Sequence, residues 1–296
     1  MDFRLTEDQR ALRAGVRELL ARRFPRDALR AAVEGDGALD RGLWRELGAA
    51  GFFALRLPEA EGGVGLGLPE AVLVFEEAGR VLLPGPLVAT HLAAGVVPGA
   101  AEGEVVVTAV DGGLVEWLDE ADVVTGDVGG AVPVRSVDPL TPLHRVPLPT
   151  TGGAGAAEPL LTTEVAGLLS AAEQVGSAGA TAEMAVAHAK SRTQFGAAIG
   201  SFQAVKHLCA GMLVRTEVAR AAVYAAAVTR DPVEIAGAKL LADEAAVACA
   251  RDCLQVHGGM GFTWEADVHL HLKRAWVRGE RWMSAAVAEE TVAAAL

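Results

Sequence analysis

The chain has 296 residues, of which 51% are hydrophobic, so it can bury a large core and we expect two or three domains. A formal net charge of −12 argues against nucleic acid as a partner, because the phosphate backbone would be repelled. The mean hydropathy of +0.30 reflects many Ala and Val residues, and no apolar run reaches the roughly 18 residues that predict a membrane span. The first residues have neither the basic start nor the apolar core of a secretory leader, so we expect a cytoplasmic protein.

The three cysteines are an odd number, which argues against a disulfide framework. Cys249, Cys253 and His257 follow one another at intervals of four on one predicted helix, a spacing that could hold a metal. A free Cys commonly behaves as a small buried apolar residue, and a fourth ligand is not apparent. We therefore predict no metal site.

Helical patterns fill residues 1–100, which we expect to form an N-terminal helical domain. A capping box at Thr6 to Gln9 predicts a first helix that runs to Phe24-Pro25. Further helices are predicted at residues 39–50, 68–81 and 84–95, separated by turn-rich segments.

Residues 101–158 have a different character, and we expect a reduced middle β domain there. Short β-branched runs divided by Gly and Asp predict strands at residues 104–108, 122–125 and 131–134. The Gly-rich segment 150–157 is typical of a flexible joint before the C-terminal helical bundle, residues 159–296. The fold class expected is mainly α with a small β unit.

Three long Pro-free segments at residues 165–191, 202–230 and 233–256 predict the main helices of a C-terminal four-helix bundle. The segment 229–232 ends in Pro and breaks the second helix from the third, so the chain turns back there. At about 1.5 Å per residue the second helix runs about 43 Å out and the third about 36 Å back. The loops at residues 192–196 and 255–262 should therefore meet at one end of the bundle.

An arginine and a glycine pair at one end of a bundle form a credible anion site. Taken alone, each motif also fits an ordinary helix terminus: Arg192 could cap a helix, and Gly258-Gly259 could be a C-cap turn. The sequence around both loops distinguishes these interpretations. The motifs concerned are, in chain order, residues 1–9, residues 43–47, Pro58-Glu59 with Gly62-Gly63-Val64-Gly65, Arg192-Thr193-Gln194-Phe195-Gly196, Ile199 with Phe202-Gln203, and Gln255-x-x-Gly258-Gly259-x-Gly261-Phe262.

In their order and spacing these motifs resemble the acyl-CoA dehydrogenase family, and the resemblance covers nearly the whole chain. In that family two neighbouring subunits share one FAD, and C-terminal loops of one subunit hold the ADP portion. The resemblance implies cofactor-binding roles for Arg192, Gln194, Phe195, Gln203, Gln255, Gly258 and Gly259.

Each of these roles has a chemical reason. Arg192 would pair with the pyrophosphate, which suits a bidentate guanidinium. Phe195 would pack beside the adenine or the ribose, and Gln203 and Gln255 would hydrogen-bond the dinucleotide. The glycine pair would let backbone N–H groups approach phosphate oxygens without a Cβ in the way.

Two departures from the family pattern indicate an incomplete active site. The family's middle domain is roughly twice as long as the segment available here, and its Thr-Glu…Gly-Ser-Asp segment is not found. The family's Glu base aligns with Trp282, which cannot abstract a proton, and an alternative base position falls near Ala166. Glu280 would point to another side of its helix, and Glu164 and Glu173 are interpreted as solvated helix residues. We therefore assign no catalytic residue.

This combination resembles the short subunit of heteromeric α2β2 bacterial acyl-CoA dehydrogenases that act on steroid-derived thioesters. The resemblance implies a longer partner subunit that holds the flavin ring, supplies the base and binds the acyl-CoA substrate. Electrons would leave through an electron-transfer flavoprotein. Two alternatives remain open: a complete homomeric dehydrogenase with a displaced base such as Glu280 or Glu164, and a noncatalytic helical protein for assembly or acyl-CoA binding.

Overall fold

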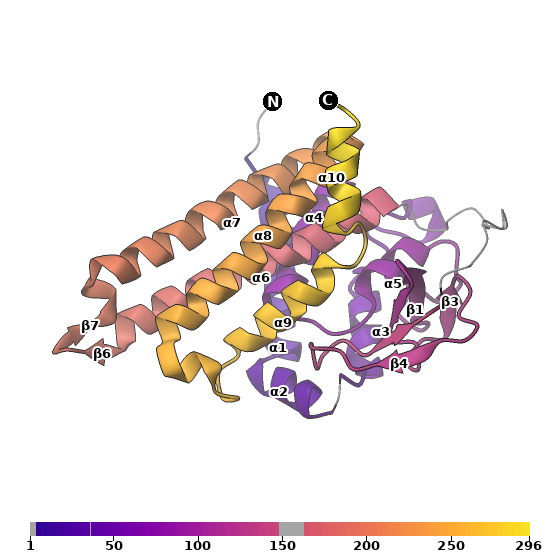
Figure 1. Ribbon diagram of the computed structural model, residues 1–296. Coiled ribbons are helices and arrows are strands. Elements are labelled where there is room, and N and C mark those ends of the chain that lie inside the picture. Colours follow the sequence, from indigo (N-terminus) through magenta and orange to yellow (C-terminus); the bar gives the residue numbers. More distant parts are fainter. Residues whose placement is uncertain (1–3, 36, 148–162) are drawn as a thin grey trace.

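Three long helices set the shape of the molecule (Figure 1). The computed structural model describes residues 4–35, 37–147 and 163–296, and it is mainly α-helical with a small β unit, as predicted. The long helices are α6 (Thr163–Ser191), α7 (Gln203–Thr229) and α8 (Pro232–His257). They lie side by side and extend away from the sheet.

The turn between α7 and α8 forms where the sequence predicts it. Arg230 adopts a left-handed conformation (φ 58°) and ends α7. The Asp231 carboxylate accepts hydrogen bonds from the N–H groups of Val233 and Glu234, and Pro232 occupies the first helical position of α8. The chain therefore reverses within two residues, and α7 and α8 run antiparallel.

The N-terminal part consists of short helices around a buried one. Its elements are α1 (Glu7–Arg23), α2 (Arg26–Glu34), α3 (Arg41–Ala49), the 3₁₀ turn η1 (Glu59–Glu61), α4 (Leu68–Arg80) and α5 (Leu87–Ala93). The capping box at Thr6 is confirmed. Helix α2 is not predicted from the sequence, because Pro25 indicates only the end of the first helix; Pro25 is also the N-cap residue of the next helix.

Helices α4 and α6 cross with their backbones in contact. A Cβ on Gly176 would lie 1.9 Å from the carbonyl oxygen of Glu76, and one on Gly79 would lie 2.0 Å from that of Glu173. Only glycine fits at such a crossing. This close packing encloses the first half of α6 between α4, α8 and α9.

The sheet contains five strands in the order β3-β1-β2-β5-β4. The strands are β1 (Val107–Asp111), β2 (Leu114–Glu116), β3 (Val123–Thr125), β4 (Val132–Val134) and β5 (Leu143–Arg145). Strands β1 and β3 pair in parallel, and the other neighbours are antiparallel. Strands β2 and β5 are not predicted from the sequence, because their sequences, Leu-Val-Glu and Leu-His-Arg, lack the β-branched runs that mark β3 and β4.

Two further helices complete the fold: α9 (Val268–Gly279) and α10 (Ala285–Ala293). No helix in the described part of the chain combines the length and the apolar character needed to cross a membrane. The predicted joint at residues 150–157 lies outside the described residues, so the domain boundaries at residues 100 and 158 stay predictions.

Candidate functional site

The two glycine-containing loops follow helix ends that are in contact at the end of the bundle remote from the sheet. Helix α6 leads into the hairpin of β6 (Thr193–Gln194) and β7 (Ala197–Ala198), followed by the turn η2 (Ile199–Ser201), and α8 leads into the turn η3 (Gly258–Phe262). The imidazole rings of His188 and His257 stack across α6 and α8, with centroids 4.1 Å apart and planes at 21°. The helix ends that carry the two loops therefore meet, as the helix lengths predict. The sequence pattern indicates His257 only as a possible metal ligand, and it does not predict this stack.

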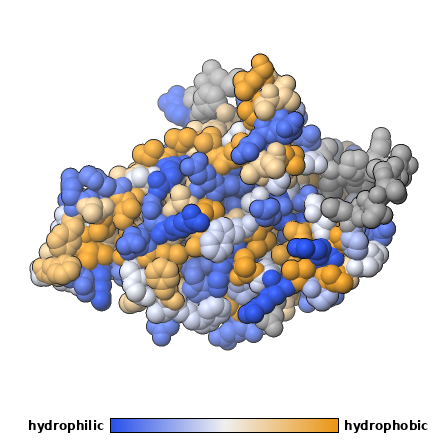
Figure 2. Space-filling model, in the orientation of Figure 1, coloured by the Kyte–Doolittle hydropathy of each residue, from blue (hydrophilic) through white to orange (hydrophobic). Residues whose placement is uncertain are grey.

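The hairpin presents an aromatic tip to solvent. Phe195 and Gly196 form its two-residue loop, and both have positive φ (53° and 78°), as a type I′ turn requires. The side chain of Phe195 is 92% exposed, and its only packing among the described aromatic residues is edge-on against Phe202, with centroids 6.1 Å apart. Apolar side chains are visible at this end in Figure 2, where Figure 1 places β6 and β7. An apolar ligand or partner surface could cover this ring.

The glycine pair faces open space. A Cβ built on Gly258 or Gly259 would meet no atom within 4 Å, and Gly258 ends α8 with φ 59°. The N–H of Gly258 bonds back to the carbonyl oxygens of Leu254 and Gln255, so it is already engaged within the chain. The glycine pair therefore leaves room for a ligand to approach the backbone closely, but the N–H of Gly258 is not a free donor for that ligand.

The other predicted site residues surround these loops. Arg192 and Gln194 are exposed in the hairpin, Gln203 is the exposed first residue of α7, and Gln255 is exposed in the last turn of α8. None of the described residues is hydrogen-bonded or ion-paired to the guanidinium of Arg192. All seven predicted residues thus come to one end of the bundle, where an anionic ligand would meet an unpaired positive charge.

Side chains fill the interior around Trp282, the residue that the resemblance aligns with the family's base. Trp282 is buried with φ 51°, and its ring packs 5.3 Å from the Arg281 guanidinium carbon. The cavity beside it measures about 20 Å³, which is room for about one water molecule. Its walls include Glu173 and Arg278. No thioester could enter this cavity as it stands.

Glu173 is not the solvated residue that sequence analysis expects; that interpretation is wrong. Its carboxylate is buried and accepts a hydrogen bond of 2.5 Å from Nη2 of Arg278. Burial raises the pKa of the Glu173 carboxyl to about 7, and the opposing attraction of Arg278 and Arg274 does not restore it. Burial likewise lowers the pKa of Arg278 to about 10.

The remaining candidate bases are elsewhere. Glu164 is exposed in the first turn of α6, and Glu280 is exposed at the end of α9. Within the described residues, no three His, Cys, Asp or Glu side chains are arranged to hold a metal. Cys253 lies 3.6 Å from Nδ1 of His257, and burial raises the pKa of its thiol to about 12, which disfavours the thiolate that a metal needs.

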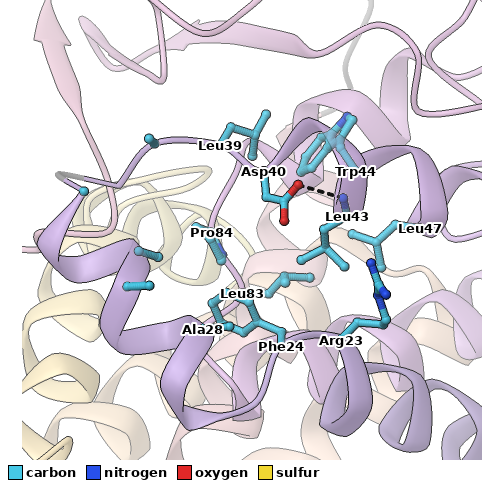
Figure 3. Close-up of a pocket in the computed structure, with 14 residues that line it drawn as sticks. Arg23, Phe24, Ala28, Leu39, Asp40, Leu43, Trp44, Leu47, Leu83 and Pro84 are labelled. Carbon is cyan, nitrogen blue, oxygen red and sulfur yellow. Dashed lines mark hydrogen bonds between the residues drawn. The ribbon is translucent and has the colours of Figure 1, made fainter.

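A separate apolar cavity of about 350 Å³ lies between the end of α1, α2, α3 and the turn after α4 (Figure 3). Its two charged wall residues are already paired. Arg23 forms an ion pair with Glu46, and the Asp40 carboxylate caps α3 by accepting from the N–H groups of Gly42 and Leu43. This cavity therefore offers no free charge to orient a ligand, and we assign it no function.

Family models match the chain on both sides of the sheet. The acyl-CoA dehydrogenase N-terminal domain matches residues 6–103, and the acyl-CoA dehydrogenase C-terminal domain matches residues 154–283. One similar protein is acyl-CoA dehydrogenase IpdE2 of Mycobacterium tuberculosis, which is 38% identical over 300 residues that cover 91% of each chain.

Solved structures have the same fold. The ChsE4-ChsE5 complex from Mycobacterium tuberculosis superimposes with a TM-score of 0.83 at 23% identity, covering 99% of this chain and 98% of that one. A structure named Tcur3481-Tcur3483 steroid ACAD gives a TM-score of 0.81 at 23% identity, with 97% of both chains covered. With its two family matches and a relative of 38% identity, this chain belongs to the acyl-CoA dehydrogenase family, whose members are FAD-dependent oxidoreductases acting on CH–CH bonds.

Proposed function

We propose that this chain is the short subunit of a heteromeric acyl-CoA dehydrogenase and that it contributes the site for the ADP portion of FAD to a longer partner subunit. The assembly would catalyse α,β-dehydrogenation of an acyl-CoA thioester. The observation that carries the proposal is the open, cationic loop pair at the end of the bundle, with Arg192 unpaired among the described residues and Gly258 and Gly259 facing free space.

The loop pair fits a dinucleotide. A guanidinium and a pyrophosphate form charge-assisted hydrogen bonds, and Arg192 is exposed beside the glycine loop with no competing acceptor among the described residues. The exposed ring of Phe195 offers a surface for the adenine or the ribose. Gln194, Gln203 and Gln255 are exposed around the same end and would hydrogen-bond the remaining polar groups.

The reacting end of the cofactor is assigned to the partner. In this chain the family's base position is Trp282, and the cavity beside it holds about 20 Å³. FAD supplies the acceptor for the β-hydride, and a carboxylate of the longer subunit would remove the α-proton. The flavin ring and the acyl chain would lie in the partner, and an electron-transfer flavoprotein would accept the electrons.

The comparisons favour a heteromer and a steroid-type substrate. Two of the structural neighbours carry two protein names each, and one of these is named a steroid ACAD. A cytoplasmic location and the division into domains at residues 1–100, 101–158 and 159–296 belong to the same proposal. A homomeric enzyme with a displaced base is less consistent with the structure, because Glu164 and Glu280 are both exposed.

The test is to express the chain alone and together with a longer acyl-CoA dehydrogenase homologue encoded beside it. Flavin absorbance per chain and dehydrogenase activity are then measured. We expect little FAD and no activity from the isolated chain, and both from the complex. A yellow, active homomer would contradict the proposal, and a stable complex that never takes up flavin would favour the noncatalytic alternative.

In the complex, Arg192→Ala should lower FAD affinity by about 10- to 100-fold, because a charge-assisted contact contributes roughly 1.5–3 kcal/mol. Arg230→Gly is the matched control, since it removes an exposed arginine at the opposite end of α7 and suits the left-handed backbone there. Equal flavin occupancy of the two variants at limiting FAD would show that Arg192 is not in the site.

A further inference from the structure

Two histidines connect the loops that the proposed function assigns to the nucleotide. His188 lies one helical turn before Arg192, and its carbonyl oxygen accepts the Arg192 N–H at 2.8 Å. His257 immediately precedes Gly258. The two half-buried rings stack with centroids 4.1 Å apart. Each ring thus stands at the base of one loop and contacts the ring at the base of the other.

The ring of His257 is fixed on its own helix. Its Nδ1 lies 2.8 Å from the carbonyl oxygen of Cys253, and because a carbonyl oxygen can only accept, this nitrogen carries a proton and donates it. The contact orients the imidazole against α8 and presents its face to His188. A stacked pair of this kind contributes roughly 0.5–1.5 kcal/mol beyond the area it buries.

We infer that His188 and His257 are positioning residues whose stack sets the spacing between the Arg192 hairpin and the glycine loop, so that both can contact one dinucleotide. The inference rests on the proposed function, because it concerns the same nucleotide site. It assigns neither imidazole a direct contact with the phosphates. Both loops must be held at a fixed separation, since a displacement of about 1 Å is enough to impair a preorganised site.

The charge environment of the stack is cationic. Burial lowers the pKa of His188, and His257 and Arg192 lower it further. Near this end, α7 carries one half-buried thiol, one exposed ammonium group and one exposed imidazole. The turn η2 carries no ionisable side chain. The α7 groups are Cys209, Lys206 and His207.

The direction of the pH dependence follows from this environment. The folded pKa of His188 lies below its ordinary value of 6.5, so the contribution of the neutral stack is present above about pH 6.5 and is lost as the pH falls below it. A protonated His188 ring would be repelled by the neighbouring Arg192, and this repulsion would weaken the stack and separate the loops. A histidine that bound phosphate directly would behave in the opposite way, because acid would strengthen FAD binding.

The experiment measures FAD affinity of the assembled complex by flavin fluorescence at pH 7.5 and 5.5. At pH 7.5, His188→Ala should weaken FAD binding by about 2- to 10-fold, the equivalent of one stacking contact, and His188→Phe should retain affinity within about 2-fold. Between pH 7.5 and 5.5 the wild type should lose affinity by a larger factor than His188→Phe. His207→Ala, an exposed imidazole at the same end, is the control and should match the wild type.

The outcomes separate this inference from the proposed function. If Arg192→Ala weakens FAD binding but both His188 variants bind like the wild type, the positioning role is wrong and the nucleotide site stands. If Arg192→Ala has no effect either, the nucleotide site itself is wrong. The stack does not set the spacing if His188→Phe binds FAD as weakly as His188→Ala. The same conclusion follows if the FAD affinity of the wild type rises as the pH falls. Size-exclusion chromatography of each variant verifies that the complex remains assembled.

Discussion

Glu173 and Arg278 form an ion pair that lies inside the protein, beside the family's base position. Burial acts against both charges, and it moves the pKa of the carboxyl up to about 7 and that of the guanidinium down to about 10. Removing two charges from water costs about as much as their attraction returns, so such a pair contributes little net stability. Its effect here is to occupy the space beside Trp282 that a substrate would need.

The pH dependence of stability should reveal this carboxyl. A folded pKa of about 7, raised from 4.5, means that the contribution of Glu173 is fully present below pH 4.5 and is lost as the pH rises through about 7. Urea unfolding between pH 4.5 and 8 should therefore show wild type losing stability relative to Glu173→Gln as the pH increases. Glu164→Gln, an exposed carboxyl on the same helix, should show no such trend. If wild type instead gained stability relative to Glu173→Gln as the pH rose, Glu173 would be an ordinary charged partner of Arg278.

Individual site residues were predictable to different degrees. The position of Arg192 and the glycine pair followed from helix lengths and one Pro, which are local properties of the sequence. The burial of Glu173 could not be predicted from local properties, because its neighbours on α4 and α9 are distant in the chain. A helix that is enclosed on all sides also lacks the polar face whose periodicity would separate exposed from buried positions. The contact between His188 and His257 was missed for the same reason: it joins residues 69 positions apart.

At the scale of elements, the sequence predicted long helices better than short strands. The bounds of α6, α7 and α8 agree with prediction to within about two residues, because each has more than 25 residues of consistent helical character. Strand β1 begins three residues later than predicted, and the three-residue strands β2 and β5 were not predicted at all. These strands are specified by pairing with one another, which no local pattern records.

The crossing of α4 and α6 depends on two glycines, and it can be tested at that level. Gly176→Ala should destabilise the fold by about 1–3 kcal/mol or more, because its Cβ would lie 1.9 Å from the backbone oxygen of Glu76 and the helices would have to separate. Gly237→Ala on α8 is the matched control, since a Cβ there meets nothing within 4 Å; it should stabilise by about 0.5–1 kcal/mol through helix propensity. Thermal unfolding of both variants gives the comparison. Equal midpoints would show that the crossing is not close-packed.

At the scale of the whole molecule, buried arginines join the sheet to the helices. Arg281, which is 1% exposed, donates to the carbonyl oxygens of Asp111 at 2.9 Å and Leu114 at 2.8 Å. Arg274 donates to the carboxylate of Asp138 and to the carbonyl oxygen of Leu83 at 3.2 Å. The segment that the resemblance aligns with the family's base therefore serves here as an attachment for the sheet, which supports the proposal of a subunit that does not perform the chemistry itself.

Arg281→Met should detach the sheet while leaving the bundle folded. The substitution keeps most of the apolar volume but removes every donor. The guanidinium is then lost from the carbonyl oxygens at the end of β1 and the start of β2, and from the buried Glu116 carboxylate. Loss of one partner from such a buried cluster costs roughly 3–5 kcal/mol. Because that cost falls on one side of the molecule, hydrogen exchange should accelerate in β1, β2 and β5 and stay slow in α7 and α8. Arg251→Met, an exposed position on α8, should change neither. If exchange accelerated equally in the sheet and the long helices, the two would form one cooperative unit, and Arg281 would not be a local attachment.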